Sequence, residues 1–481
     1  MRYFMKKIYA ILICLAVLAA AVGGTLYWYN STYIRFDEET LRRDITELTL
    51  TGETLPELEL LQQLTQLTQL DVRSMGLTFE EYDVLKAGLP NCRILWKVPF
   101  QGKYLSEDTQ KLTVQALSYE DLKAIPYLPA LKTVHAEGCR DYEVLAALRE
   151  AYPALEVLYT VSVGGTEYPV DTVSITVKNA ETEEVRTALK YLPKLEEITF
   201  TGTAPDNETI YQMMCDYPQV RFIWTLTLFG KEMGNTITEL NLSGIKMKDT
   251  GEIESYLKYF PDLTKVEMCD CGIPSEEMDA MGKRWPNIRF IWTVRVGLAT
   301  LRTDAIGFMP WKHGHRGGNP LRDKDCKELK YCIDLICLDL GHMKVSDISF
   351  LQYMPKMKYL IVGELPCPDF TPIRYCKELI YLEIFNVTFQ HQEILLELPK
   401  LQDLNMGSTK IYGTGVLKQM TWLKRLWIAG TGLTYAEYDE LVAALPNTQV
   451  VMHIPHSTAG GWRDHQNYRD MRDILGVFYL E

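Results

Sequence analysis

The chain has 481 residues, of which 47% are hydrophobic and 23% are charged, and its formal net charge is −13. This length exceeds what one compact core usually holds, so the chain must either divide into domains or be built from repeats. The globular composition excludes a wholly disordered chain. The acidic balance, without a stripe of lysine and arginine, excludes nucleic acid as a partner.

The first predicted element is a membrane anchor. A basic stretch at residues 2–7 precedes an uncharged, apolar run over residues 8–29. About 20 apolar residues cross a bilayer as a helix, and a basic flank stays on the cytoplasmic side. We therefore expect residues 1–30 to anchor the chain in the cell membrane, with the bulk of it extracellular. The alternative is a cleaved signal peptide, because the alanines at residues 19–21 resemble a cleavage site, and the chain is then secreted.

The clearest feature after the anchor is an internal repeat of the form L-x-x-L-x-L, with any apolar residue at each L. In the C-terminal half the repeat recurs with a constant step of 22 residues. The apolar positions of the five copies are Leu335/Leu338/Leu340, Met357/Leu360/Val362, Leu379/Leu382/Ile384, Leu401/Leu404/Met406 and Leu423/Leu426/Ile428. Such self-similarity predicts a stack of identical short strands.

The N-terminal half uses the same pattern with a longer rhythm. Copies at Ile45 and Leu67 are followed by copies at Leu131, Leu195 and Leu263, which lie 64 to 68 residues apart. Helical stretches that end before a proline separate these strands from second strands. We expect the second strands to face inward at Cys92/Leu95, Leu155/Leu158, Val220/Ile223 and Ile288/Ile291. An aromatic residue and a glycine follow each second strand, which predicts a β-hairpin.

The physical reading of this pattern is a solenoid. In each strand the L side chains point inward and the x side chains point outward, and one unit cannot bury its apolar edge alone. Stacking the units produces a parallel sheet with a continuous core and a curved, exposed inner face.

These motifs resemble the leucine-rich-repeat family over about residues 45–452. The 22-residue block resembles internalin-type bacterial surface proteins, and the first half resembles leucine-rich-repeat proteins of Gram-positive gut bacteria. The resemblance implies an α/β fold: a leucine-rich-repeat solenoid with a parallel concave β-sheet and convex helices and turns, preceded here by a transmembrane helix. One departure concerns the position three residues after the last L, which is often asparagine in the family. Here it holds residues such as Met343, Leu365, Thr409 and Thr431, so weaker side-chain hydrogen bonds and packing must hold neighbouring repeats, the rungs of the solenoid, together.

We predict six segments along the chain. They are the anchor or signal segment (1–30), a spacer and first cap (31–44), a long-period repeat block with hairpins (45–298), a joint (299–325), the 22-residue block (326–452) and a C-terminal cap (453–481). The joint contains several glycines and prolines.

No arrangement of residues typical of catalysis is present, so we predict that the chain is not an enzyme and has no cofactor and no metal site. His313 and His315 flank a glycine in the joint, and His453, His456 and His465 lie in the C-terminal cap, where surface polar contacts are the expected role. Most of the eleven cysteines are expected to be buried free thiols. Cysteines at equivalent positions of repeats that lie two strands apart are too far from each other to form a disulfide.

The outward positions of the strands carry aromatic residues on both halves. In the first half Trp96, Tyr159, Trp224 and Trp292 are expected on the concave side, covered by their hairpins. The second half has no predicted hairpin, so its strip should be exposed, as is typical of binding hot spots. The predicted binding strip consists of Tyr359, Tyr381, Phe385, Gln402, Asp403, Asn405, Arg425 and Trp427.

These observations predict a cell-surface leucine-rich-repeat protein that binds a protein or a glycan outside the cell through its concave face. The alternative is a structural or self-assembling envelope scaffold without a soluble ligand. Self-association is compatible with both.

Overall fold

The structure is a computed structural model that describes residues 2–36, 39–52, 54–179, 181–315 and 317–477. It divides the chain into two compact units, Met1–Trp224 and Thr225–Glu481.

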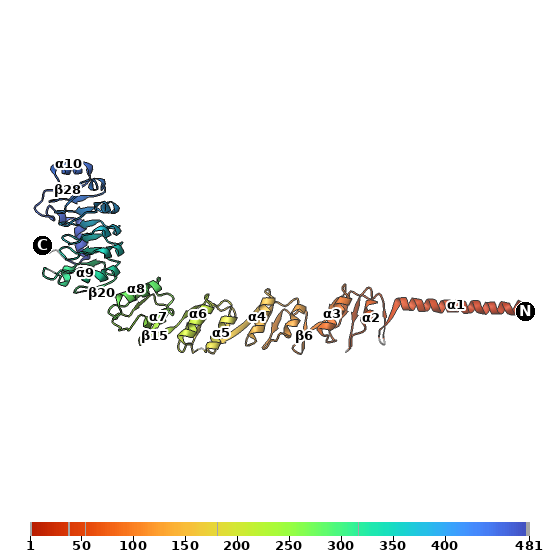
Figure 1. Cartoon of the computed structure of the whole chain (residues 1–481). Coiled ribbons are helices and arrows are strands. Elements are labelled where there is room, and N and C mark those ends of the chain that lie inside the picture. The colour runs from red at the N-terminus through yellow and green to blue at the C-terminus, as the bar shows by residue number, and fades with distance from the viewer. Residues whose placement is uncertain (1, 37–38, 53, 180, 316, 478–481) are drawn as a thin grey trace. The chain divides into compact units, whose positions relative to one another are not determined.

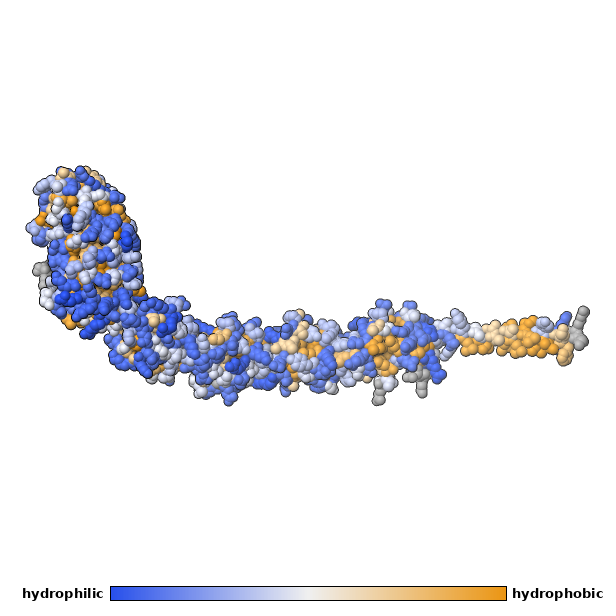
Figure 2. Space-filling model, in the orientation of Figure 1, coloured by the Kyte–Doolittle hydropathy of each residue, from blue (hydrophilic) through white to orange (hydrophobic). Residues whose placement is uncertain are grey.

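Unit 1 begins with the helix α1 (Arg2–Thr32), whose 31 residues extend about 46 Å at 1.5 Å per residue. That length exceeds the roughly 30 Å hydrocarbon core of a bilayer. The helix meets the hydropathy criterion for a membrane span over Tyr3–Thr32, and its surface is hydrophobic (Figure 2). Signal sequences meet the same criterion. A short hairpin of β1 (Tyr33–Phe36) and β2 (Glu39–Arg42) follows.

The rest of unit 1 consists of parallel sheets of three rungs each, with helices on one side (Figure 1). The strands are β3 (Glu47–Thr49), β4 (Gln69–Asp71) and β5 (Arg93–Leu95); β8 (Lys111–Thr113), β9 (Thr133–Ala136) and β10 (Glu156–Val163); β12 (Ser174–Val177), β13 (Glu197–Phe200) and β14 (Arg221–Ile223). The helices are α2 (Leu58–Gln62), α3 (Phe79–Gly88), the 3-10 helix η1 (Asp121–Tyr127), α4 (Tyr142–Ala151), α5 (Thr182–Tyr191) and α6 (Asn207–Asp216).

Unit 2 continues with one such sheet of β17 (Glu239–Asn241), β18 (Lys265–Glu267) and β19 (Arg289–Ile291), covered by α7 (Gly251–Leu257) and α8 (Ser275–Arg284). A parallel sheet of seven strands follows, in which neighbours in sequence are neighbours in space (Figure 1). Its strands are β22 (Gly307–Phe308), β23 (Cys337–Asp339), β24 (Tyr359–Ile361), β25 (Tyr381–Glu383), β26 (Asp403–Asn405), β27 (Arg425–Trp427) and β28 (Gln449–Val451).

The two rhythms of the sequence correspond to two kinds of rung. In the 22-residue repeats the return path is a 3-10 turn of three to six residues, whereas the longer repeats use α-helices of mostly ten. The turns and helices of unit 2 are η2 (Pro310–His313), α9 (Asp323–Cys326), η3 (Lys327–Tyr331), η4 (Ser349–Tyr353), η5 (Thr371–Tyr375), η6 (Gln392–Glu397), η7 (Leu417–Gln419), α10 (Tyr435–Ala444), η8 (Trp462–Asp464) and α11 (Gln466–Ile474). The last repeat, from Arg425 on β27 to Gln449 on β28, has more than 22 residues because it contains the helix α10.

Four antiparallel hairpins leave the rungs. They are β6 (Lys97–Phe100) with β7 (Lys103–Ser106), β10 with β11 (Thr166–Pro169), β15 (Thr225–Leu228) with β16 (Lys231–Gly234), and β20 (Thr293–Val296) with β21 (Ala299–Arg302). Gln101 and Gly102 join the first pair with φ angles of 48° and 72°. Two consecutive residues with positive φ form the tight turn whose twist matches that of a hairpin, which explains the glycine after each second strand.

The second strand of each long repeat is shifted by one residue from the predicted register. Leu70 pairs with Ile94 rather than Leu95, so Ile94 and Trp96 face the core. Trp96 stacks on Tyr82 of α3 with ring centroids 4.0 Å apart. Because side chains alternate along a strand, one residue of shift moves the ring from the concave face to the helix side. The expectation of concave aromatics in the first half is therefore wrong for Trp96 and for its equivalents Tyr159, Trp224 and Trp292.

One turn position repeats every 22 residues in the left-handed backbone region. His342, Glu364, Asn386 and Ser408 have φ angles of 63°, 59°, 50° and 59°. Each of these residues donates its N–H to a carbonyl of the next rung, which offsets the cost of about 1–2 kcal/mol for a side chain in this region. Three residues after the last L, the hydroxyl of Thr409 donates to the carbonyl of Ile384 at 2.6 Å. That bond confirms a threonine ladder bond in place of an asparagine.

The cysteines are free thiols. Cys14 and Cys215 are exposed, and the nine others are buried. The prediction that most cysteines are buried free thiols is therefore confirmed.

Candidate functional site: the concave face of the seven-stranded sheet

The face of the seven-stranded sheet that lies away from the 3-10 turns, which we call the concave face, is formed by two rows of side chains that flank the buried leucines. The residues of each row pair in register from strand to strand, one rung apart. The first row is Cys337, Tyr359, Tyr381, Asp403, Arg425 and Gln449, and the second row is Asp339, Ile361, Glu383, Asn405, Trp427 and Val451. The face thus combines aromatic rings with three carboxylates and one guanidinium.

A segment of the same unit covers this face. After β28 the chain turns back, and residues 453–477, which we call the C-terminal segment, run across the strands toward β22. The indole of Trp427 donates to the carbonyl of Ala459 at 2.9 Å. Farther along, Cys337 on β23 donates its thiol to the carbonyl of Met471, and Lys312 reaches the carbonyl of Leu475 at 2.8 Å. The segment therefore contacts rungs from one side of the sheet to the other.

This segment buries the predicted binding strip. Tyr359, Tyr381, Phe385, Asp403, Asn405, Arg425 and Trp427 are all buried, and only Gln402 is exposed. The expectation that the strip faces solvent is therefore wrong for every member but Gln402. The alternation of side chains placed these residues on the concave side correctly, but it carried no information on what lies against them. Whether they bind a partner stays a prediction.

The centre of the covered face is a pocket filled by the indole of Trp462. Its ring lies 5.2 Å from that of Tyr381 and 5.1 Å from that of Trp427, and the guanidinium of Arg425 lies 4.4 Å from it. Trp462 is fully buried. Desolvated aromatic and arginine contacts of this kind supply most of the energy of protein interfaces.

Two buried carboxylates hold the polar groups around this indole. Glu383 accepts hydrogen bonds from the indole Nε1 of Trp462 at 2.8 Å, from the guanidinium of Arg463 at 3.0 Å and from the hydroxyl of Tyr381. A buried carboxylate is costly unless it is paired, so the position of Glu383 depends on the guanidinium that the C-terminal segment supplies. Burial also raises the pKa of the Tyr381 hydroxyl, which keeps it a donor.

The second carboxylate belongs to Asp403. It forms a bidentate pair with Arg425 at 3.0 and 2.8 Å, and it accepts a hydrogen bond from Asn467 of α11 at 2.9 Å. His465 lies 3.2 Å from the same carboxylate. One group of the sheet and two groups of the C-terminal segment thus converge on one buried acid. Such a network fixes the segment in a single position.

A third acid of the face, Asp339, has no cation of the sheet bonded to it. Its carboxylate accepts the N–H of Gly341 at 3.0 Å. Burial raises its pKa to about 6, and the nearby Glu383 adds to this effect. The face therefore has an excess of negative charge that the sheet itself does not neutralise.

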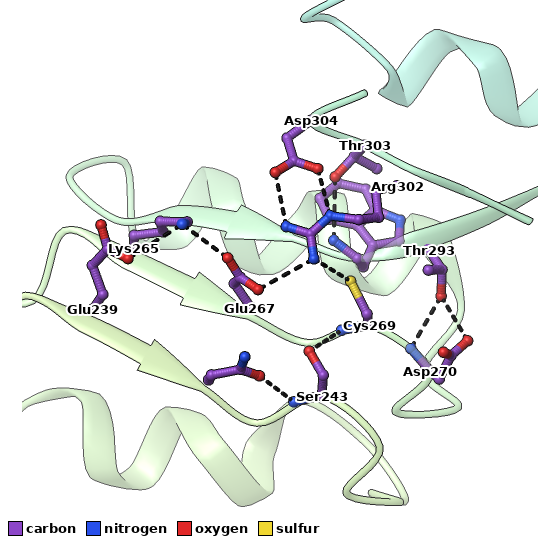
Figure 3. A network of polar contacts seen from close by, with 12 residues as sticks. Glu239, Ser243, Lys265, Glu267, Cys269, Asp270, Thr293, Arg302, Thr303 and Asp304 are labelled. Atoms are coloured by element: carbon purple, nitrogen blue, oxygen red, sulfur yellow. Dashed lines mark hydrogen bonds and ion pairs between the residues drawn. The ribbon is translucent and has the colours of Figure 1, made fainter. Parts of the chain in front are cut away.

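The smaller sheet of unit 2 has a polar network on its concave side (Figure 3). Arg302 of β21 forms a bidentate contact with Asp304 at 2.8 Å and reaches Glu267 at 3.2 Å, and Lys265 contacts Glu267 at 2.8 Å. These contacts hold the pKa of Glu267 below its ordinary value, with the Arg302 hydrogen bond as the main cause. The charges of Glu239, Lys265, Glu267, Arg302 and Asp304 are paired with one another, so this network joins neighbouring strands and leaves little of their charge free for a ligand.

A groove of about 700 Å³ lies where α8 adjoins the 3-10 turn η3. Its lining includes Trp292, Tyr331 and the half-exposed Tyr353, with Lys283 and Lys330 among its polar groups. A groove of this size can accommodate a small ligand or an interface side chain.

The histidines singled out in the sequence have structural roles. His315 is buried, its Nε2 accepts the N–H of Leu298 at 2.9 Å, and its Nδ1 lies 3.1 Å from the carbonyl of Asn319. It therefore fastens the tip of the β20–β21 hairpin. His313 stacks on Phe308. No group of three metal-ligating side chains occurs among the residues that the structure describes.

Sequence reasoning missed the residues of the C-terminal segment that fill the face. Trp462 and Arg463 follow two glycines, and the apolar residues Tyr468 and Met471 of α11 and Leu475 at its C-cap recur at helical spacing. Together these signals indicated a docked amphipathic helix, although not its binding surface.

No protein-family model and no curated protein matches this chain. Solved structures similar to it include an internalin of Listeria monocytogenes (15% identity, TM-score 0.24, 88% of this chain and 87% of that one). A second internalin of that species is 18% identical with a TM-score of 0.26 over 45% of this chain and 81% of its own. A leucine-rich-repeat protein of Leptospira interrogans is 16% identical with a TM-score of 0.29 over 85% and 96%. These neighbours belong to the class that the repeat resembles, and at these scores the likeness says nothing of ligands.

Proposed function

We propose that the chain is a membrane-anchored, extracellular leucine-rich-repeat protein that binds a polypeptide partner on the concave face of its seven-stranded sheet. The observation that carries this proposal is that the face already folds around a polypeptide, the C-terminal segment. Trp462 fills an aromatic pocket, and Glu383 and Asp403 satisfy the polar groups around it. These are the contacts of a protein interface, and they favour a polypeptide over a glycan as the ligand.

The proposed location depends on α1. Its length and hydropathy suit a membrane span, and the basic residues before the apolar run stay in the cytoplasm. The rest of unit 1 and the whole of unit 2 are then outside the cell, where the concave face can meet a partner.

A second candidate function is structural, and the path of the C-terminal segment favours it. In a solenoid each repeat contacts only its neighbours. The C-terminal segment joins Trp427 on β27 to Cys337 on β23, which are four strands apart. A segment that bridges distant rungs stiffens the stack, as a load-bearing scaffold of the envelope requires.

Photo-crosslinking from Gln402 in living cells separates the two functions. Gln402 is exposed and directly precedes the covered Asp403 of β26, so a photoreactive phenylalanine analogue there leaves the core intact. We expect adducts between the anchored full-length chain and a different polypeptide, identified by mass spectrometry. The same analogue at Tyr375, exposed on η5, is the matched control and should not give that adduct. Adducts from position 402 only within the chain, or only between copies of it, would exclude the binding function and support the scaffold.

A further inference from the structure

We propose that the concave face selects polypeptide segments in which a tryptophan is followed directly by an arginine and then by a short helix, and that the C-terminal segment is a resident occupant that such a partner must displace. This inference rests on the proposed function of the face as a polypeptide-binding surface. It adds the chemical class of the partner and the competitor that controls access.

The charges of the face require a cation from the occupant. The two rows contain the acids Asp339, Glu383 and Asp403 and a single cation, Arg425, which Asp403 engages in a bidentate pair. Glu383 therefore has no cation from the sheet strands, and the segment provides Arg463 at 3.0 Å. An occupant with an acid or a neutral residue at this position leaves Glu383 buried and unpaired, which proteins avoid.

The pocket beside this cation selects a tryptophan. The indole of Trp462 fills the space between Tyr381 and Trp427, and its Nε1 donates to Glu383 at 2.8 Å. A phenylalanine fills part of this space but has no N–H to donate, so a carboxylate oxygen of Glu383 loses its hydrogen-bond donor. Sites built around a buried hydrogen bond discriminate strongly against ligands that lack the donor.

The occupant can leave without dismantling the solenoid. The seven strands β22–β28 pair with one another and not with the C-terminal segment, so the buried leucine rows persist when the segment departs. The connection between β28 and η8 spans residues 452–461 and ends in Gly460 and Gly461, both with positive φ. An occupant on the same chain acts at an effective concentration of about millimolar, which an external partner has to overcome.

A peptide titration with the full-length chain in lipid nanodiscs tests this inference. The probe is a fluorescent peptide of residues 458–477, followed by its anisotropy. The chain is compared in its natural form and as Trp462→Ala/Arg463→Ala, which releases the resident segment. We expect the released chain to bind the peptide at least tenfold more tightly than the natural chain. Arg463→Glu alone is the second released variant, because it removes the cation from the buried Glu383 and places a second acid beside it, while the tryptophan itself is unchanged.

Matched peptides test the chemical class. A peptide with phenylalanine for tryptophan should bind the released chain at least tenfold more weakly, and so should one with glutamate for arginine. Glu383→Gln in the released chain should reduce the preference for arginine over glutamate. Equal affinity for a scrambled peptide would overturn the inference and leave polypeptide binding by the face intact. No peptide binding by the released chain would also overturn it, and the crosslinks from Gln402 would then decide separately whether the face binds any polypeptide.

Discussion

Replacement of Trp462 by alanine should detach the C-terminal segment and leave the sheet folded. The indole is fully buried against Tyr381, Trp427 and Arg425, and loss of a buried tryptophan typically costs about 3–5 kcal/mol. That cost falls on the docking of the segment, because the strands pair without it. A detached nine-residue helix is not stable in water, so α11 should unfold.

Limited proteolysis measures this detachment at known sites. Trypsin cleaves after Arg463, Arg469 and Arg472, which lie in the docked segment. Because cleavage follows the population of the open form, a loss of 3–5 kcal/mol should raise the cleavage rate by about two to four orders of magnitude. Tyr375→Ala, at a side chain that is 51% exposed, is the control and should change the rate less than threefold. A rise below tenfold in Trp462→Ala, or equally fast cleavage within the strands, would refute the reasoning.

Three further changes test other parts of the structure. Arg425→Met should destabilise the fold by about 3–5 kcal/mol in urea unfolding, because it leaves Asp403 buried without its cation, and the added Asp403→Leu should recover most of that loss; no recovery would contradict this view of the pair. The raised pKa of Asp339, about 6, means that its contribution to stability is complete below about pH 4 and is lost as the pH rises through 6. Asp339→Asn should therefore stabilise the chain by roughly 1–3 kcal/mol at pH 7.5 and not at pH 4, and an equal effect at both would contradict the assignment. Native alkylation with iodoacetamide should label Cys215, and Cys14 where lipid does not shield it, while any third label before denaturation would contradict the burial of the other thiols.

The repeat could be read from the sequence because its physical cause is local. A strand that buries one side against its neighbours needs apolar residues at fixed positions, and Leu338, Leu360, Leu382, Leu404 and Leu426 occupy the same place on successive rungs. The hairpins could also be predicted from the sequence, since their turns need residues that accept positive φ.

The register of the second strands could not be predicted from the sequence pattern alone. Both Ile94 and Leu95 are apolar, so the pattern alone fits either side facing inward. The stacking of Trp96 on Tyr82 decides the matter, and that contact depends on the helix position rather than on the strand. Short apolar runs therefore leave a one-residue ambiguity that only packing resolves.

The sequence predicted which face of the sheet carries the candidate-site residues, but it did not predict what covers them. Tyr381, Asp403 and Trp427 do lie on the concave side. What covers them is a segment whose hydrogen bond to Trp427 comes from 32 residues away in sequence, and strand alternation contains no information about such a contact. The excess of acids on the face was the available signal, because a buried Glu383 has no cation among the strands and requires a partner from elsewhere.

Hydrogen exchange of the natural, full-length chain tests most directly whether an outside polypeptide and the C-terminal segment compete for one face. Exchange is followed by mass spectrometry in η8 and α11 and in the strands β25 to β27, with and without the peptide of residues 458–477 at millimolar concentration. We predict that the peptide lowers the protection of residues 462–474 and leaves that of the strands unchanged. Binding of the peptide with full protection of the C-terminal segment would contradict the central claim, because the peptide would then occupy another surface.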